Sequence, residues 1–410
     1  MNKIFIPICM VSILFYQAAR ADIAQTLSIE SLLHSTWDHS PALQAQKEQA
    51  SLADGDRYRR FIFNEPQFSV ASADDKSELS YGVNLVTGFP GKAFGLAKLD
   101  TAKAHAQNAE FQAKKHELSK VIVQSYIDCA AAREGVRVQT ATSSDLETLF
   151  KTLKAIYENG RSTQAEKIGA ELQARQAHLD LLTAQDKEIV LCKKLRTTLK
   201  TMGVDQEIDG QTVPLPDDLD EKVLSEIGDE TSDQARALSG MELADANSST
   251  AWWSQVPDLV LGVSRNNYVY FPASPSGKQW TTSLSISMTV PILFPFRESV
   301  EASRAKSQAV LDRNAAEVQK VSADSDRIDG AQEYLRNKRR LSEVRATDLP
   351  LAQALVDSTY SAYQTGKLGY AELVLSRKTL SDILNQDIQL RVSVISAHLR
   401  CLNQCEVAAQ

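Results

Sequence analysis

The stretch IYENGRSTQAE at residues 156–166 returns as AYQTGKLGYAE at residues 362–372, and this repeat is the starting point for predicting the fold. Tyr, Gly, Ala and Glu occur at matching positions, so the stretches align without a gap. A pattern that recurs within one chain indicates that a structural unit is used twice. Glycine readily adopts the left-handed backbone conformation that lets the chain turn back after a helix. We therefore expect two helical reversals, at Gly160 and Gly366.

Long helical segments flank both reversals. Residues 93–156 and 163–202 surround the first, and residues 297–362 and 369–402 surround the second. All four are rich in Ala, Gln, Glu, Lys, Leu and Arg, with apolar residues at the three- and four-residue spacing of helices. Pro350 interrupts the third segment, where a kink is expected because proline removes one helical hydrogen bond. Helices of this length must pair with neighbours, since alone they have no core to bury their apolar face.

Short segments with a two-residue period precede each long pair. Apolar residues alternate with small polar ones at residues 68–70 and 79–85, and again at 259–263 and 283–290. This alternation predicts strands with one apolar and one polar face. A half-buried hairpin of a water-soluble domain would show it too, but here the polar face consists of small hydroxyls, as in a membrane barrel. Four strands cannot close a barrel, so several copies must contribute strands to one barrel.

The N-terminal residues have the pattern of an export signal. Lys3, an apolar stretch and Ala19-Arg20-Ala21 follow the order of a cleaved signal peptide, which places the start of the mature chain at Asp22 outside the cytoplasm. An uncleaved anchor is less favoured, because the apolar stretch is shorter than the roughly 20 residues of a spanning helix. The 12 Pro and 17 Gly among 410 residues indicate long helices with few loops.

Charge and histidine content exclude several classes of function. The net charge of -7 is spread along the chain without the dense basic patch that binds nucleic acid. The six histidines are scattered without the spacing of a metal site or a catalytic triad, and there is no methionine cluster. We therefore expect neither an enzyme nor a bound cofactor or metal.

The order of helix, strand pair, long helix, Tyr-x-x-Gly reversal and returning helix, used twice, resembles the outer-membrane factor family that includes TolC. The resemblance covers essentially the whole mature chain. It implies a signal peptide at 1–21, a first repeat at 22–202 with its tip at 157–163, an irregular equatorial insertion at 203–229, and a second repeat at 230–410 with its tip at 363–369. Further matches are Ser40-Pro41, Asn64-Glu65-Pro66, Pro257-Asp258-Leu259 and the segment 290–294.

The sequence around Pro350 looks like the cation-efflux branch of that family, the CusC and CzcC type. Leu349-Pro350 and Ala352 precede the second reversal in the order typical of this branch. Two features depart from the family pattern. Pro295-Phe296-Arg297 stands where a glycine is usual, and no lipid-acceptor cysteine follows the signal. Lipidation is therefore not expected.

The resemblance implies a mostly α fold with a small β part. Long α-helical hairpins would form a periplasmic α-barrel, and four strands per chain would contribute to a trimeric 12-stranded β-barrel in the bacterial outer membrane. Such a homotrimer passes solutes, including heavy-metal cations in the cation-efflux branch, from an inner-membrane pump of most often RND type and a periplasmic adaptor protein to the exterior. Two alternatives stay open: a duct for type I protein secretion, and a periplasmic coiled-coil adaptor or scaffold. The cargo is not predicted.

The resemblance also places functional residues at the periplasmic tips. Glu372 matches an acidic position that lines the pore constriction of the family, and Glu166 is its counterpart in the first repeat. A ring of three Glu372 carboxylates would favour cations. Both glutamates fit equally well in the first turn of a helix, where negative charge suits the helix dipole. The residues expected to contact the adaptor are Tyr157, Gly160, Tyr363 and Gly366.

Four cysteines remain after removal of the signal, in a compartment that favours disulfides. Cys129 and Cys192 lie at nearly equal sequence distances from Gly160, so they should lie at the same height on neighbouring antiparallel helices. We favour a disulfide between these two and rank Cys401 with Cys405 second. Small buried thiols in a helical seam are the alternative.

Overall fold

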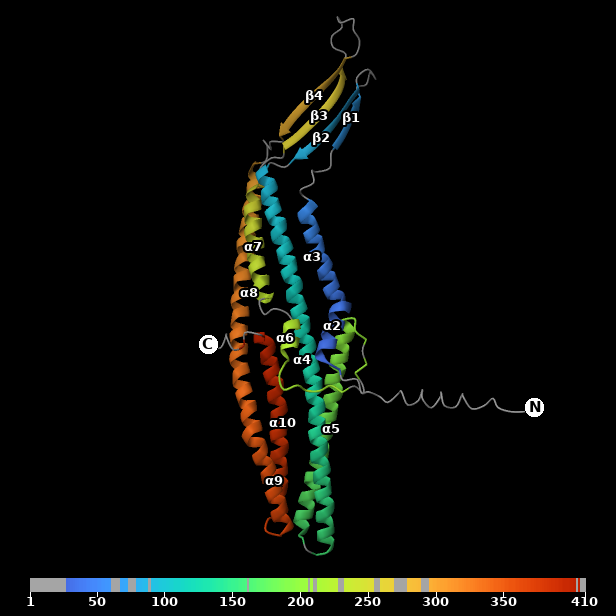
Figure 1. Cartoon of the computed structure of the whole chain (residues 1–410), viewed down its shortest axis with the longest axis vertical. Helices are drawn as coiled ribbons and strands as arrows, with labels where there is room; N and C mark the ends of the chain where they lie inside the picture. The colour runs from blue at the N-terminus through green and yellow to red at the C-terminus, as the bar shows by residue number, and fades with distance from the viewer. Residues whose placement is uncertain are drawn as a thin grey trace, which may run out of the picture. The chain divides into compact units, whose positions relative to one another are not determined.

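The computed structural model of the chain consists mainly of long helices with one small sheet (Figure 1). The signal expected at residues 1–21 lies outside the described residues, as do Asn64-Glu65-Pro66, Pro257-Asp258 and the segment 290–294. The chain divides into two units, of which the first comprises residues 1–41, 116–229 and 326–410 and the second residues 42–115 and 230–325. The structure describes residues 27–59, 67–72, 79–87, 90–160, 162–205, 207–208, 212–227, 232–253, 259–268, 279–288, 295–402 and 405.

Both halves of the chain carry the same order of elements. The first half contains helices α2 (Ile29–His39) and α3 (Pro41–Arg59), strands β1 (Gln67–Ser72) and β2 (Leu79–Thr87), and helices α4 (Pro90–Glu158) and α5 (Gln164–Thr201). The second contains helix α7 (Ser232–Trp253), strands β3 (Leu259–Tyr268) and β4 (Gln279–Met288), and helices α8 (Pro295–Glu343), α9 (Leu349–Gln364) and α10 (Tyr370–Cys401). Helices α2 and α3 are separated at Ser40, which is extended because Pro41 follows it.

The two predicted reversals share one local geometry. Gly160 and Gly366 both have φ of 70°, the left-handed conformation that glycine adopts without strain. The N–H of Gly160 donates to the carbonyl of Tyr157 at 2.8 Å, and the N–H of Gly366 donates to the carbonyl of Tyr363 at 3.0 Å. The Tyr-x-x-Gly spacing therefore reflects a hydrogen-bonded turn that ends α4 and α9 in the same way.

The interruption at Pro350 is a short π-helix. Residues Val344–Asp348 form η1, which joins α8 to α9. Pro350 lies in the first turn of α9, and Asp348 before this helix is itself helical, so the chain continues through this point without leaving the helix. The expected position of the break is correct, but its form is a wider helical turn that accommodates the proline.

The insertion at 203–229 was expected to be irregular, and this is wrong for its second part. Helix α6 (Glu221–Ile227) lies there. Val223, Leu224 and Ile227 are buried and recur at helical spacing, and they join a core with α2, α4, α5 and α10. Burial of this apolar face explains why the segment folds as a helix.

Two adjacent aspartates attach the insertion to the second half of the chain. The Asp217 carboxylate accepts two hydrogen bonds from the Arg345 guanidinium in η1, at 2.7 and 2.8 Å. Asp218 accepts a hydrogen bond from Tyr334 Oη at 2.7 Å and lies 2.6 Å from Nδ1 of His398 in α10. Burial by itself would raise the pKa of Asp218, but the hydrogen bonds with His398 and Tyr334 outweigh it and bring the pKa to about 2.

We expect Asp218→Asn to lower the free energy of unfolding at neutral pH by about 1 to 2 kcal/mol, a figure that allows for solvent screening of the partly exposed carboxylate. Because the pKa of Asp218 is lowered from 3.8 in the unfolded chain to about 2, its contribution is present above pH 3.8 and is lost as the pH falls towards 2. The melting-temperature difference between wild type and variant, measured by circular dichroism, should therefore shrink from pH 5 to pH 2. A difference that stays constant over this range would contradict the prediction.

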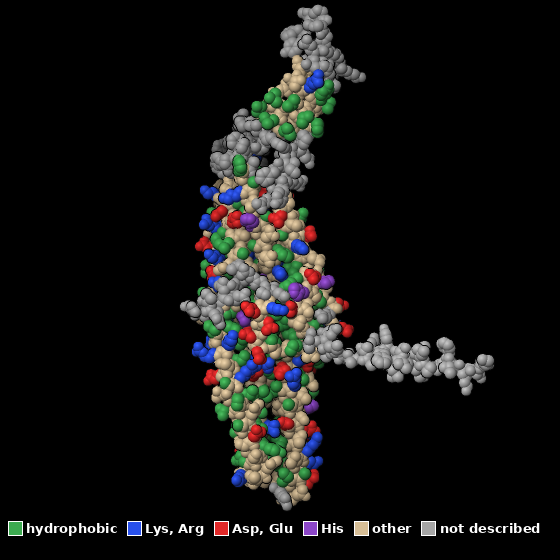
Figure 2. Space-filling model, in the orientation of Figure 1, with side chains coloured by type: hydrophobic (Ala, Val, Ile, Leu, Met, Phe, Trp, Pro, Cys, Tyr) green, Lys and Arg blue, Asp and Glu red, His purple; other side chains and the backbone are tan. Residues whose placement is uncertain are grey.

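The sheet is an antiparallel meander in the order β1-β2-β3-β4. Strands β2 and β3, from different halves of the chain, pair with Val83 opposite Val263 and Thr87 opposite Leu259. One face is apolar and exposed, as the alternation predicts, and hydrophobic side chains cover it in Figure 2. Its exposed members are Phe68, Val70, Tyr81, Val263, Leu284 and Ile286.

The four described cysteines form two disulfides. Cys129 of α4 is bonded to Cys192 of α5, with a Cα–Cα distance of 4.7 Å. Cys401 is bonded to Cys405 with a Cα–Cα distance of 4.8 Å. A bond within an intact helix would be strained, but α10 ends at Cys401 and Leu402 has a positive φ of 44°. Cys405 therefore lies beyond the helix end, where the chain can bring its sulfur to Cys401.

Candidate functional site at the hairpin tips

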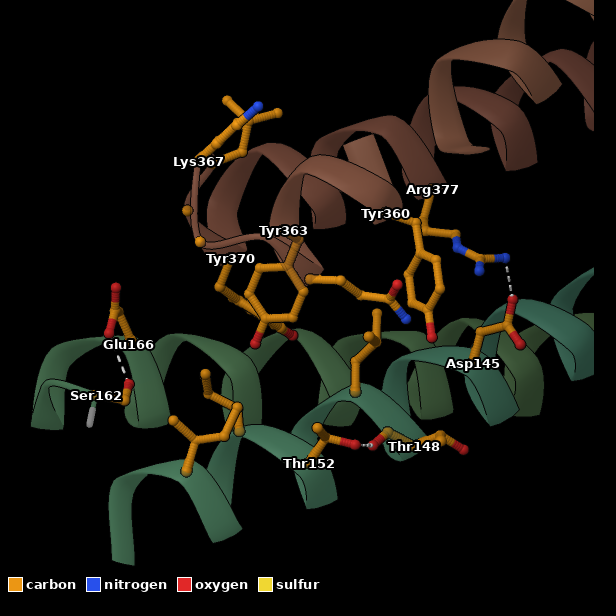
Figure 3. A pocket seen from close by; sticks show the side chains of 17 residues that line it. Asp145, Thr148, Thr152, Ser162, Glu166, Tyr360, Tyr363, Lys367, Tyr370 and Arg377 are labelled. Atoms are coloured by element: carbon orange, nitrogen blue, oxygen red, sulfur yellow. Dashed lines mark hydrogen bonds and ion pairs between the residues drawn. The ribbon is translucent and has the colours of Figure 1, made fainter. Parts of the chain in front are cut away.

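A groove of about 800 Å³ lies between the two helical hairpins close to their reversals (Figure 3). Helix α4 and the start of α5 form one wall, and α9 and α10 form the other. Three phenol rings extend from the second hairpin towards the first, as Figure 3 shows. The rings belong to Tyr360, Tyr363 and Tyr370, and they face Leu149, Leu153 and Ile156.

Ionic and hydroxyl contacts tie the hairpins together along the groove. Arg377 of α10 donates to the Asp145 carboxylate of α4 at 2.5 Å. Further from the tips, the Thr142 hydroxyl donates to Ser381 Oγ at 3.2 Å. Tyr370 is only 6% exposed, and this burial raises its pKa to about 12. The phenol of Tyr370 is therefore neutral at physiological pH.

Glu166 has a structural role at the start of α5. Its backbone N–H donates to Thr163 Oγ1 at 3.3 Å, and its carboxylate accepts from the Thr163 N–H at 3.0 Å, which together make a capping box. The Ser162 hydroxyl donates to the same carboxylate at 2.6 Å. These hydrogen bonds, first from Ser162 and then from Thr163, lower the pKa of Glu166. The carboxylate is thus charged and held in place.

Glu372 occupies the matching sequence position but has different surroundings. It lies in the first turn of α10, which begins after Gly369 and has no side-chain cap. Its side chain is exposed, and within the described part of the chain its carboxylate has no hydrogen bond or ion pair. Leu368 and Gly369 replace the Ser162-Thr163 pair of the first reversal, so the hydroxyls that hold Glu166 are missing here.

Only some of the residues predicted to be functional at the tips line the groove. Tyr363, Gly366 and Glu166 line the groove, whereas Tyr157, Gly160 and Glu372 do not. Burial, followed by the nearby charge of Glu166, raises the pKa of Tyr363. Sequence reasoning missed Tyr360, Tyr370 and the pair of Arg377 with Asp145. No sequence signal marks that pair, because its members are 232 positions apart.

The described residues contain no group of His, Cys, Asp and Glu side chains that could hold a metal ion. Among the same residues, no helix is long and apolar enough to span a membrane.

No protein-family model and no curated protein matches the sequence. Solved structures do match. The outer membrane protein VceC from Vibrio cholerae is 15% identical and aligns over 92% of this chain and 95% of its own, with a TM-score of 0.71. CusC, described as forming a transmembrane channel, is 16% identical over 93% of this chain and 92% of its own, with a TM-score of 0.68. The outer-membrane channel OprN is 12% identical over 93% of this chain and 90% of its own, with a TM-score of 0.69.

These likenesses confirm the predicted fold class, in which long helical hairpins are combined with four antiparallel strands. At this level of sequence identity they establish the fold alone.

Proposed function

We propose that the chain, which has the fold of the TolC-type outer-membrane channels, is one subunit of an outer-membrane efflux duct. The observation that carries the proposal is the shared fold with VceC, CusC and OprN over nearly the whole chain. The duct conducts solutes and catalyses no reaction. We further propose that the signal at residues 1–21 directs export and is removed before the chain reaches the outer membrane.

The sheet supports assembly into a homotrimer. Its outer strands β1 and β4 each pair on one side only, so the four-stranded sheet has two open edges. Open edges are not tolerated in lipid, where every backbone N–H and C=O must be paired. Three copies would join these edges into one closed barrel and turn the exposed apolar face towards the membrane.

The helices support the same assembly. Helix α5 pairs with α4 through buried residues such as Ala177 and Leu195, yet it carries a second, exposed apolar stripe. Helix α8 has a comparable exposed stripe. Both stripes have the three- and four-residue spacing of helical seams, which neighbouring copies would cover. Their members are Ile168, Leu172, Leu179, Leu182 and Ile189 on α5, and Val318, Val321, Ile328 and Leu335 on α8.

Fractionation and heat-modified migration test the proposal. We expect the full-length protein in the outer-membrane fraction, running as a trimer in unheated gels and as a monomer after boiling, because barrel closure requires all copies. A periplasmic coiled-coil adaptor or scaffold would also have long helices but would fractionate with the periplasm. A soluble monodisperse monomer would therefore overturn the proposal.

The two reversals are the proposed contact points for other proteins. A periplasmic adaptor would bind at Tyr157, Gly160, Tyr363 and Gly366, and an inner-membrane pump of RND type would supply the cargo, with heavy-metal cations as candidates. The solved structures with a similar fold do not separate this function from type I secretion. Identification of the pump and adaptor that co-purify with the cross-linked trimer would distinguish the two.

We expect Glu372→Gln to lower the cation preference of the open duct, because a three-fold ring of unpaired carboxylates attracts cations. Glu166→Gln should change selectivity less, since the Glu166 carboxylate is engaged in the capping box. Reversal potentials across planar bilayers in a KCl gradient measure both effects. Equal selectivity of wild type and Glu372→Gln would exclude a pore role for Glu372.

A further inference from the structure

The apolar face of the sheet carries one charged side chain, that of Arg265 in β3. No other charged residue occurs in the four described strands. Side chains alternate between the faces of a strand, so Arg265 shares its face with Val263, and both side chains are exposed. An arginine on a face that meets lipid is destabilising near the middle of the membrane, and much less so where its guanidinium reaches the membrane surface. The position of Arg265 on this face therefore needs an explanation.

Arg265 lies between two hydroxyl side chains in one row across three strands. The pairing register places Tyr81 of β2 opposite Arg265 on one side and Thr282 of β4 opposite it on the other. All three side chains are exposed, and directly paired residues share one face, with Cβ atoms about 4.5 to 5.5 Å apart. A phenol, a guanidinium and a hydroxyl thus form a row of hydrogen-bond donors.

The donor row begins where the purely apolar rows of this face end. The next row towards the helices pairs Val83 with Val263 and Val263 with Leu284, and Phe68 pairs with Val83 at its edge. The row after that consists of Leu85, Leu261 and Ile286. A molecule bound at the donor row would therefore have a polar site above and an apolar surface below it.

The donor row lies towards the strand ends that are remote from the helices. Arg265 follows six residues after Leu259, where β3 begins opposite Thr87, and α4 starts shortly after Thr87. At roughly 3.4 Å per residue this distance is about 20 Å along the strand. With the strand tilt of about 40° in a membrane barrel, Arg265 lies about 15 Å up an apolar band of about 25 Å. Because an arginine side chain can extend along apolar surface to a polar boundary, the guanidinium reaches towards the outer membrane surface.

We propose that Tyr81, Arg265 and Thr282 bind the phosphate group of an anionic lipid in the outer leaflet, with one lipid per subunit. The guanidinium can donate two parallel hydrogen bonds to a phosphate, and the two hydroxyls can donate to its remaining oxygens. The acyl chains of the lipid would lie along the apolar rows that contain Val263 and Leu284. The inference rests on the proposed duct, since only closure of the barrel turns this face towards lipid.

Native mass spectrometry of the detergent-solubilised, full-length trimer tests the inference, with diphosphorylated lipid A as the probe. We expect the wild type to bind one lipid A per subunit and Arg265→Gln to bind it about ten-fold more weakly, because a charge-assisted pair of hydrogen bonds is lost. Tyr81→Phe and Thr282→Val should each weaken binding by less. The matched control is Arg304→Gln, the same substitution at an exposed position of α8 outside the strands, which should bind like the wild type.

Two further measurements separate a lipid from a free phosphate. Lipid A without its phosphates should bind the wild type as weakly as diphosphorylated lipid A binds Arg265→Gln, and an excess of inorganic phosphate should not displace the lipid. Equal binding by the wild type and Arg265→Gln, indifference to the phosphates, or displacement by inorganic phosphate would each overturn the inference and leave the duct in place. If the wild type is a monomer in the same spectra, the proposed duct itself is wrong.

Discussion

Gly262→Leu is expected to reduce the amount of assembled trimer in the outer membrane by about ten-fold or more. A leucine at this position would direct its side chain onto the polar face of the sheet, where Asn84 and Ser285 already occupy the space of the first carbon atom. Overpacking of this kind costs about 1 to 3 kcal/mol, and about 1.4 kcal/mol suffices for a ten-fold change in population. Band intensity of the unheated trimer relative to the boiled monomer measures the effect.

Val263→Leu is the matched control for this prediction. It enlarges the neighbouring side chain, but Val263 is 50% exposed on the apolar face of the sheet, where a larger apolar group can extend into lipid. We expect this variant to assemble like the wild type. If Gly262→Leu assembles as well as Val263→Leu, the polar face has room for a larger side chain, and the argument from crowding is wrong.

Removal of the disulfide between Cys129 and Cys192 is expected to lower the free energy of unfolding by about 4 kcal/mol in the chain-entropy model. The bond closes a long loop, since the two cysteines are 63 positions apart, and so restricts the unfolded chain strongly. We propose that it forms after export and links α4 to α5. The double variant Cys129→Ser/Cys192→Ser should therefore melt at least about 5 °C below the wild type.

The second disulfide provides the control for loop length. Cys401 and Cys405 are only 4 positions apart, and closure of so short a loop contributes about 2 kcal/mol in the same model. The variant Cys401→Ser/Cys405→Ser should therefore melt above Cys129→Ser/Cys192→Ser. Peptide mapping of non-reduced protein from the outer membrane checks the pairing directly. Free thiols at Cys129 and Cys192 would show that the long crosslink does not form in the cell.

Structural elements that depend on residues close together in the sequence could be predicted. The reversals at Gly160 and Gly366 were recognisable because a glycine three positions after a tyrosine closes one hydrogen-bonded turn, which depends on adjacent residues only. Alternation over a few residues likewise revealed the strands. Helix α6 was missed because the Asp-, Gly- and Pro-rich stretch before it suggested a loop throughout, and its apolar face becomes stable only against a core built from several distant helices.

Equivalent sequence positions of the two tip glutamates do not imply equivalent side-chain environments. Glu166 and Glu372 occupy equivalent places after their reversals, yet only Glu166 is held by a capping box. A readable signal existed, since a threonine three residues before a glutamate marks such a cap, and Gly369 stands at that place in the second reversal. The difference in side-chain environment was therefore accessible from local sequence.

Local patterns were sufficient to predict the long helices, the two reversals, the strands and their faces, because these depend on residues within one or two turns of each other. The pairing of strands from the two halves, and the contacts of Arg345 with Asp217 and of Arg377 with Asp145, became visible only in the folded chain. Such contacts depend on how long helices pack side by side. A shift of one helical turn, about 5.4 Å, would exchange every partner while leaving the local pattern unchanged.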